Sequence, residues 1–87
     1  MIVGLDIGGA NTKAASSDGS IAESVYLPIW RDAPLGKFLQ RMAEMNPESV
    51  GVVITGELAD CYRSKAEGIT SIKAAVEKAF RCPIFFW

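Results

Sequence analysis

Two short apolar runs, separated by a helix-like stretch, most constrain the fold of this chain. The first covers residues 2–7 and is followed at once by Gly8-Gly9, the pattern of a buried strand that ends in a tight turn. The second, residues 50–54, is continuous and β-branched, which predicts a strand covered on both faces. A right-handed crossover through a helix would set the two strands parallel, so we expect an α/β fold.

Further strands are expected on both sides of this pair. Residues 12–17 and 21–29 flank Asp18-Gly19, a strong hairpin signal. Pro28 cannot donate a hydrogen bond to a neighbouring strand, so the second of these strands should lie at a sheet edge. Another apolar strand begins at Pro83 and continues to Trp87.

Two amphipathic helices separate the later strands. The first begins at Asp32-Ala33-Pro34 and stops at Asn46-Pro47. Its apolar stripe, interpreted as core, is Leu35, Phe38, Leu39, Met42 and Met45. The second follows a capping-box pattern over residues 64–67 and continues toward Pro83. Its apolar face is Ala66, Ile69, Ile72, Val76 and Phe80.

The order strand, strand, strand, helix, strand, helix, strand predicts a mixed five-stranded sheet of spatial order 3-2-1-4-5 in one domain, residues 1–87. Its last strand, residues 84–87, would be a hydrophobic edge, which proteins normally cover. We therefore expect either self-association through this strand or a missing C-terminal half, with this chain as the truncated front half of a longer protein.

Composition excludes several classes of function. Nine Lys and Arg against ten Asp and Glu, with no run of like charge, argue against nucleic acid or a membrane as partner. The chain has no histidine, which removes imidazole-based catalysis and His-based zinc sites. Cys61 and Cys82 are interpreted as reduced packing residues. Without a signal sequence or a membrane-length apolar run, we expect a cytoplasmic domain.

A loop after the first strand carries the sharpest chemical signal. Asp6 ends the strand, Gly8 and Gly9 allow backbone amides to approach a phosphate, and Asp6 could hold Mg²⁺. Three further residues would add polar groups and one positive charge: Asn11, Thr12 and Lys13. The alternative, a glycine turn in which Asp6 caps backbone amides, stays open. The glycine spacing matches neither a dinucleotide fingerprint nor a P-loop.

A second group of polar residues follows the strand over residues 50–54. If this strand is parallel to the first, Asp6 and Glu57 would face one crevice at the carboxyl ends, with a metal between them to offset their repulsion. Glu57 could equally be a solvated loop residue. Arg63, just before a helix, could hold an anion or be an ordinary surface cation.

Three strings of the sequence resemble a known family. They are residues 6–13, residues 26–31 and residues 53–69. The first is similar to the first phosphate loop of the actin/Hsp70/sugar-kinase superfamily, in its hydantoinase/oxoprolinase-like branch. Together they resemble archaeal tetrahydromethanopterin-linked C1-transfer pathway proteins, among them a methanofuran-biosynthesis synthase. The resemblance implies a ribonuclease-H-like fold and spans essentially the whole chain.

That resemblance implies a reaction and roles for the candidate residues. The synthase joins an aminomethyl-furanmethyl diphosphate to γ-glutamyl-tyramine and releases pyrophosphate. Asp6 with Mg²⁺, and the amides of Gly8 and Gly9 with Lys13, would stabilise the leaving group. Glu57 would take the phenol proton or orient the substrate amine. Family members are several times longer, so we expect this chain alone to hold an incomplete site. The alternatives are an ATP-dependent phosphotransferase or oxoprolinase-type hydrolase, and a catalytically silent fragment that self-associates.

Overall fold

The computed structural model describes residues 1–8, 11–26, 32–54 and 65–87, and gives only the backbone for residues 32–34 and 65–66. Seven elements follow one another within these ranges: β1 (Ile2–Ile7), β2 (Asn11–Ser16), β3 (Ala22–Tyr26), α1 (Asp32–Ala43), β4 (Ser49–Ile54), α2 (Lys65–Ala79) and β5 (Ile84–Phe86). This is the element order predicted from the sequence.

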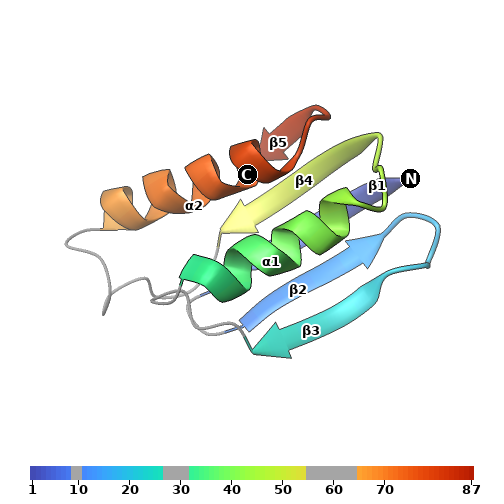
Figure 1. Ribbon diagram of the computed structural model, residues 1–87, viewed down its shortest axis with the longest axis horizontal. Helices are drawn as coiled ribbons and strands as arrows, with labels where there is room; N and C mark the ends of the chain where they lie inside the picture. Colours follow the sequence, from blue (N-terminus) through green and yellow to red (C-terminus); the bar gives the residue numbers. More distant parts are fainter. Residues whose placement is uncertain (9–10, 27–31, 55–64) are drawn as a thin grey trace.

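The five strands form one mixed sheet in the order β3-β2-β1-β4-β5, as Figure 1 shows. β2 runs antiparallel to both β1 and β3, whereas β4 is parallel to β1 and β5 is parallel to β4. The predicted α/β fold and strand order are therefore confirmed. The ends of β1 and β4 coincide, because Ile7 pairs with Ile54.

The hairpin between β2 and β3 turns at the predicted Asp18-Gly19 pair. Gly19 has a φ of 79°, a left-handed conformation that glycine adopts without a steric penalty. The Asp18 carboxylate accepts hydrogen bonds from the Ser16 hydroxyl (2.7 Å), the Ser20 hydroxyl (2.7 Å) and the Ser20 amide (3.0 Å). The bonds from Ser20, then that from Ser16, lower the pKa of Asp18 from 3.8 to about 2.

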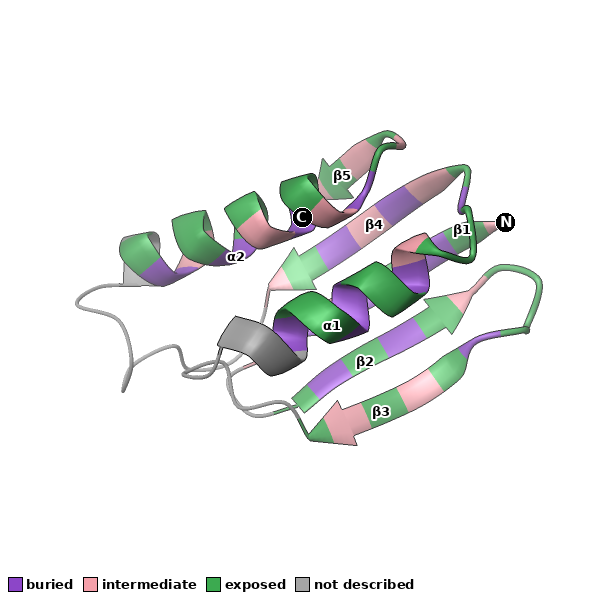
Figure 2. Cartoon of the chain, in the orientation of Figure 1, coloured by how far each residue is buried: buried purple, intermediate pink, exposed green. Residues whose placement is uncertain are grey.

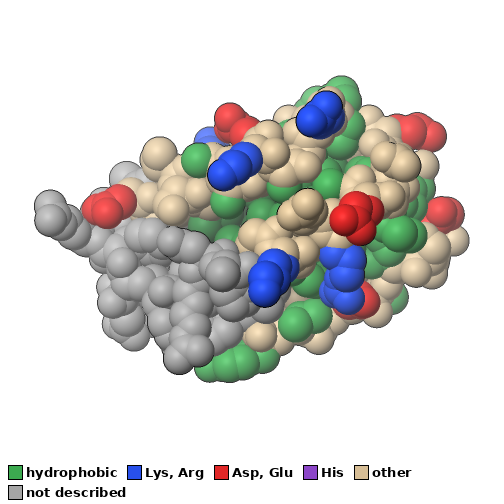
Figure 3. Space-filling model, viewed as in Figure 1, with side chains coloured by type: hydrophobic (Ala, Val, Ile, Leu, Met, Phe, Trp, Pro, Cys, Tyr) green, Lys and Arg blue, Asp and Glu red, His purple; other side chains and the backbone are tan. Residues whose placement is uncertain are grey.

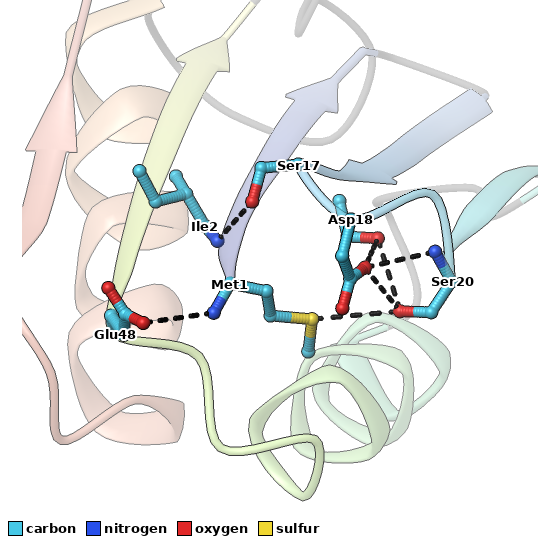
Figure 4. A network of polar contacts seen from close by, with 7 residues as sticks. Met1, Ile2, Ser17, Asp18, Ser20 and Glu48 are labelled. Carbon is cyan, nitrogen blue, oxygen red and sulfur yellow. Dashed lines mark hydrogen bonds and ion pairs between the residues drawn. The ribbon is translucent and has the colours of Figure 1, made fainter.

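The amino end of β1 is fixed on both of its sides, as Figure 4 shows. The Ile2 amide donates to the Ser17 hydroxyl at 2.8 Å, next to the β2–β3 hairpin. The Met1 ammonium lies 3.3 Å from the Glu48 carboxylate, just before β4. These contacts tie the start of the central strand to both of its neighbours in the sheet.

Both helices pack on the same face of the sheet (Figures 1 and 2). The connections from β3 to β4 and from β4 to β5 cross the sheet in the same direction, so right-handed crossovers place both helices on one side. Alternate strand residues point toward them and are buried, among them Val3, Leu5, Ile7, Val50 and Val52. They form one core with buried helix residues that include Leu39, Ile72 and Val76.

Within the described residues, the helices cover only one face of β4, whereas the sequence predicted cover on both faces. Val50 and Val52 are fully buried, but Val53 on the opposite face is 40% exposed. The same handedness that gathers both helices on one side leaves the other side without a helix from the described residues. We call this second side, which carries Val53 and the alternate residues of each strand, the open face.

The helix ends agree with their predicted signals, with one correction. α1 begins at Asp32, and its chain reverses at Asn46, which has a φ of 54°. Met45 was assigned to the core stripe, yet it lies beyond the end of α1 and is 46% exposed. α1 is only 12 residues long, so the helical spacing no longer applies at that position. Cys82 is a half-buried free thiol packed against the core, while Cys61 lies outside the described residues.

Candidate functional site

Asp6 and Lys13 lie side by side at the carboxyl end of β1. They are direct cross-strand partners in the antiparallel β1–β2 pair, so their side chains share one face of the sheet. That face is the open one, because their neighbours Leu5, Ile7 and Thr12 point into the core. Asp6 is half-buried and Lys13 is exposed. Asp6 therefore does not point into the core between sheet and helices, and it shares the open face with Lys13.

Thr12 points the other way. Successive residues of a strand alternate between faces, so Thr12 faces the helices, whereas Asn11 and Lys13 face away from them. Its side chain is fully buried, and among the described residues its hydroxyl oxygen has no hydrogen-bond partner. We expected Asn11, Thr12 and Lys13 to serve one site, but the structure places them on two faces of the sheet. Asn11 and Lys13 share a face with Asp6, and the Thr12 hydroxyl lies on the opposite side of the sheet.

The amide of Gly8 already has a partner. It donates to the Asn11 carbonyl at 3.0 Å and so extends the β1–β2 ladder by one pair beyond Ile7 and Thr12. To contact a phosphate, the Gly8 amide would have to break its hydrogen bond to the Asn11 carbonyl or donate to both acceptors at once. Its proposed role stays a prediction.

Asp6 and Glu57 were predicted to share the rim, the edge of the sheet at which parallel strands end. The arrangement of the strands agrees with this prediction. β1 and β4 are parallel neighbours, and Asp6 pairs with Val53, one residue before β4 ends. Glu57 follows that end by three residues, but it lies outside the described residues, as do Gly9 and Arg63. Whether these three side chains reach the rim therefore stays a prediction.

The described acidic residues do not form a metal centre by themselves. No group of three His, Cys, Asp or Glu side chains that could hold an ion is found within the described ranges. Mg²⁺ is commonly held by one or two carboxylates together with substrate phosphates and water. One carboxylate, that of Asp6, beside the ammonium group of Lys13 is compatible with that mode of binding. It is not a preformed cage for an ion.

Tyr26 is a neighbour of the candidate site that the sequence analysis did not single out. It pairs with Asn11 across β2 and β3, and its side chain is 64% exposed on the open face. An aromatic ring one strand away from Asn11 could stack on a flat substrate group. The sequence carries no clear signal for this position, because single exposed apolar side chains are common and the outward direction of Tyr26 follows only from the β2–β3 register.

Other surfaces of the described chain lie away from this rim. A groove of about 990 Å³ separates the C-terminal halves of α1 and α2, and its lining includes Glu44, Lys78 and Arg81 but none of the candidate residues. Figure 3 shows acidic and basic side chains interspersed over the helix-bearing side. None of the described helices is long and apolar enough to cross a membrane.

Comparison with known proteins gives one clear similarity. No protein-family profile matches the sequence. The chain is 42% identical, over 87 residues and 98% of its own length, to the "(4-{4-[2-(gamma-L-glutamylamino)ethyl]phenoxymethyl}furan-2-yl)methanamine synthase" of Methanocaldococcus jannaschii. It spans only 26% of that relative's length. The similarity supports the resemblance to a methanofuran-biosynthesis synthase. It gives no support to the wider placement in the actin/Hsp70 superfamily or its hydantoinase/oxoprolinase-like branch.

Proposed function

We propose that this chain is the phosphate-binding front part of an enzyme with the activity of its relative, a synthase of methanofuran biosynthesis. Identity of 42% over the whole chain supports this proposal. The observation that carries it is the cross-strand pair of Asp6 and Lys13, which presents an acidic and a basic group together at the end of the central strand. The carboxyl ends of parallel strands are the usual place for ligands in open α/β sheets.

The relative's product name indicates the bond that the enzyme makes. A phenoxymethyl group on a furan is an aryl ether, with the phenol oxygen bonded to the methylene carbon. We propose that the phenol of γ-glutamyl-tyramine attacks the methylene carbon of an aminomethyl-furanmethyl diphosphate. The phenol loses its proton, the new carbon–oxygen bond forms, and the bond between that carbon and the diphosphate oxygen breaks. Pyrophosphate leaves with the electron pair of the broken bond.

The residues of this chain would act mainly on the leaving group. Lys13 supplies a positive charge to the diphosphate, and the exposed Asn11 amide can donate a hydrogen bond on the same face. Asp6 is the carboxylate that would hold Mg²⁺, which when bound neutralises part of the charge on a diphosphate. Glu57 is the proposed acceptor of the phenol proton, and Arg63 and the amide of Gly9 are further proposed phosphate contacts. The roles of these three depend on residues that the structure does not describe.

The chain corresponds to about a quarter of the relative's length, so the whole reaction needs groups from outside residues 1–87. We propose that the remaining groups come from polypeptide equivalent to the rest of the relative, and that residues 1–87 contribute the diphosphate side of the site. The alternative with the same loop is an ATP-dependent phosphotransferase or hydrolase.

Thermal unfolding of the chain distinguishes these candidates. In the presence of Mg²⁺, we expect pyrophosphate to raise the melting temperature, because a ligand that binds only the folded state stabilises it. Pyrophosphate without Mg²⁺ should give a smaller shift. A shift with ATP and none with pyrophosphate would favour the phosphotransferase. No shift with either ligand would favour the catalytically silent fragment.

A further inference from the structure

The open face changes in chemical character from β1 to β3. Asp6 on β1 and Lys13 on β2 are charged and lie side by side. The next row toward the carboxyl end of β1 pairs the amide of Asn11 with the aromatic ring of Tyr26 on β3. A ligand that lies over these rows would therefore meet charged groups at one end and a flat ring at the other.

Tyr26 points away from the helices. Its neighbour Val25 packs against the core, and successive strand residues alternate between the two faces of the sheet. The Tyr26 side chain is largely exposed, and its ring has no aromatic partner among the described residues. Phe85 and Trp87, the other exposed rings in the described ranges, lie against each other at the β5 edge of the sheet.

Tyr26 and Lys13 are close enough for both side chains to contact one small molecule. Lys13 pairs with Ser24, two residues before Tyr26, so Lys13 and Tyr26 are diagonal neighbours in an antiparallel pair of strands. Diagonal neighbours lie about 7–8 Å apart, a separation that aromatic and long side chains can span. Asn11 adjoins both, because it is the direct partner of Tyr26 and lies two residues from Lys13 on β2.

The diphosphate substrate of the proposed reaction presents its groups in the same order. A single methylene carbon joins its furan ring to the diphosphate, so the ring lies next to the charged group. A diphosphate held beside Lys13 would leave that ring within reach of Tyr26. The phenol enters opposite the leaving diphosphate, so the ring of the second substrate lies farther from Lys13 than the furan does.

We propose that Tyr26 binds the furan ring of the diphosphate substrate by stacking, next to a diphosphate held at Lys13 and Asn11. This inference rests on the proposed function and adds to it a residue that determines specificity. Stacked aromatic rings gain about fivefold in affinity beyond what their buried area contributes. The site would therefore prefer diphosphates that carry a flat ring over those that carry an alkyl chain.

Titration calorimetry in the presence of Mg²⁺ with three ligands tests this proposal. They are pyrophosphate and two stable analogues, in which a methylene group replaces the oxygen that joins the diphosphate to a furanmethyl or a butyl group. We expect the wild type to bind the furan analogue about fivefold more tightly than the butyl analogue. Tyr26→Leu should lose this preference and bind pyrophosphate as the wild type does. Tyr26→Phe keeps the ring and should keep the preference.

Phe85→Leu is the matched control. It removes an exposed ring at the opposite edge of the sheet and should leave both the affinities and the preference unchanged. Circular dichroism checks that each variant folds.

The outcomes separate this inference from the function on which it rests. A preference that survives in Tyr26→Leu would assign the ring contact to another residue, and one that is lost equally in Phe85→Leu would show that Tyr26 has no specific role. Binding of pyrophosphate by the wild type without a preference between the analogues would overturn the role of Tyr26 and leave the proposed function standing. Failure to bind any of the three ligands would overturn both.

Discussion

The ring of Trp87 lies across the backbone of Gly51 so closely that a β-carbon at Gly51 would be 2.8 Å from ring atom Cζ3. The contact is on the open face, where Trp87 follows β5 and Gly51 occupies the middle of β4. The Trp87 amide also donates to the Val52 carbonyl at 2.9 Å, which holds the chain beside this position. Glycine at position 51 is therefore what allows the indole to rest on the sheet.

Gly51→Ala should displace this ring at little cost to the fold. Trp87 is 78% exposed, so the ring can move away, and we expect the free energy of unfolding to change by less than about 1 kcal/mol. The NMR signals of the Trp87 indole and of Phe85, whose ring centroid is 6.3 Å from it, should both shift. Gly36→Ala is the control, because no described atom outside the adjoining helix backbone lies within 4 Å of a β-carbon there. Unchanged indole signals in Gly51→Ala would contradict the contact.

Thr12→Val should stabilise the protein. The Thr12 hydroxyl is buried without a hydrogen-bond partner among the described residues, and valine replaces it with a methyl group of similar shape. We expect the free energy of unfolding, measured with urea, to rise by about 1 kcal/mol. Thr12→Ser, which keeps the hydroxyl and loses the methyl group, should be less stable than the wild type. A lower stability for the valine variant would mean that the hydroxyl has a partner after all.

Asp18→Ala should reduce stability in a pH-dependent way. The pKa of Asp18 in the folded protein is about 2, below its ordinary value of 3.8, so its ionised form stabilises the fold. That contribution is fully present above about pH 4 and is lost as the pH falls through 2. The melting temperatures of wild type and variant should therefore differ at pH 6 and converge toward pH 2.

Leu39→Ala should be among the most costly single substitutions. Leu39 is fully buried on the face of α1 that contacts the sheet, and its removal leaves a cavity in a small core. We expect a loss of about 3 kcal/mol in the free energy of unfolding, measured with urea. The neighbouring exposed residue provides the comparison, since Gln40→Ala should change stability by less than about 0.5 kcal/mol. Similar effects at the two positions would contradict the assigned helix face.

Much of the fold could be predicted because local signals and topology agree. The Asp18-Gly19 hairpin, the proline before β5 and the helical stripe from Leu35 to Met42 each indicated an element that the structure contains. The coverage of β4 could not be predicted in the same way. A run of β-branched residues such as residues 50–54 is found both in strands buried on two faces and in strands buried on one face. The sequence pattern alone therefore does not tell how many faces of β4 are covered. The handedness of both crossovers decides between these two arrangements.

The candidate site was predicted less completely than the fold. The pairing of Asp6 with Lys13 follows once the β1–β2 hairpin register is known, and spacing along the sequence does not supply that register. Strand alternation also separates Thr12 from Asn11 and Lys13, although the three are consecutive and were expected to act together. The hydrogen bond from the Gly8 amide to the Asn11 carbonyl likewise results from the pairing of β1 with β2, and the Gly8-Gly9 pair in the sequence does not predict it.

The central claim is that Asp6 and Lys13 form part of a site for a metal-bound diphosphate. Isothermal titration calorimetry with pyrophosphate, with and without Mg²⁺, tests it on the wild type, Asp6→Asn and the control Glu77→Gln, an exposed carboxylate on α2. We predict Mg²⁺-dependent binding by the wild type and by Glu77→Gln, and binding at least tenfold weaker in Asp6→Asn. Equal binding by all three proteins, or no binding by the wild type, would contradict the account.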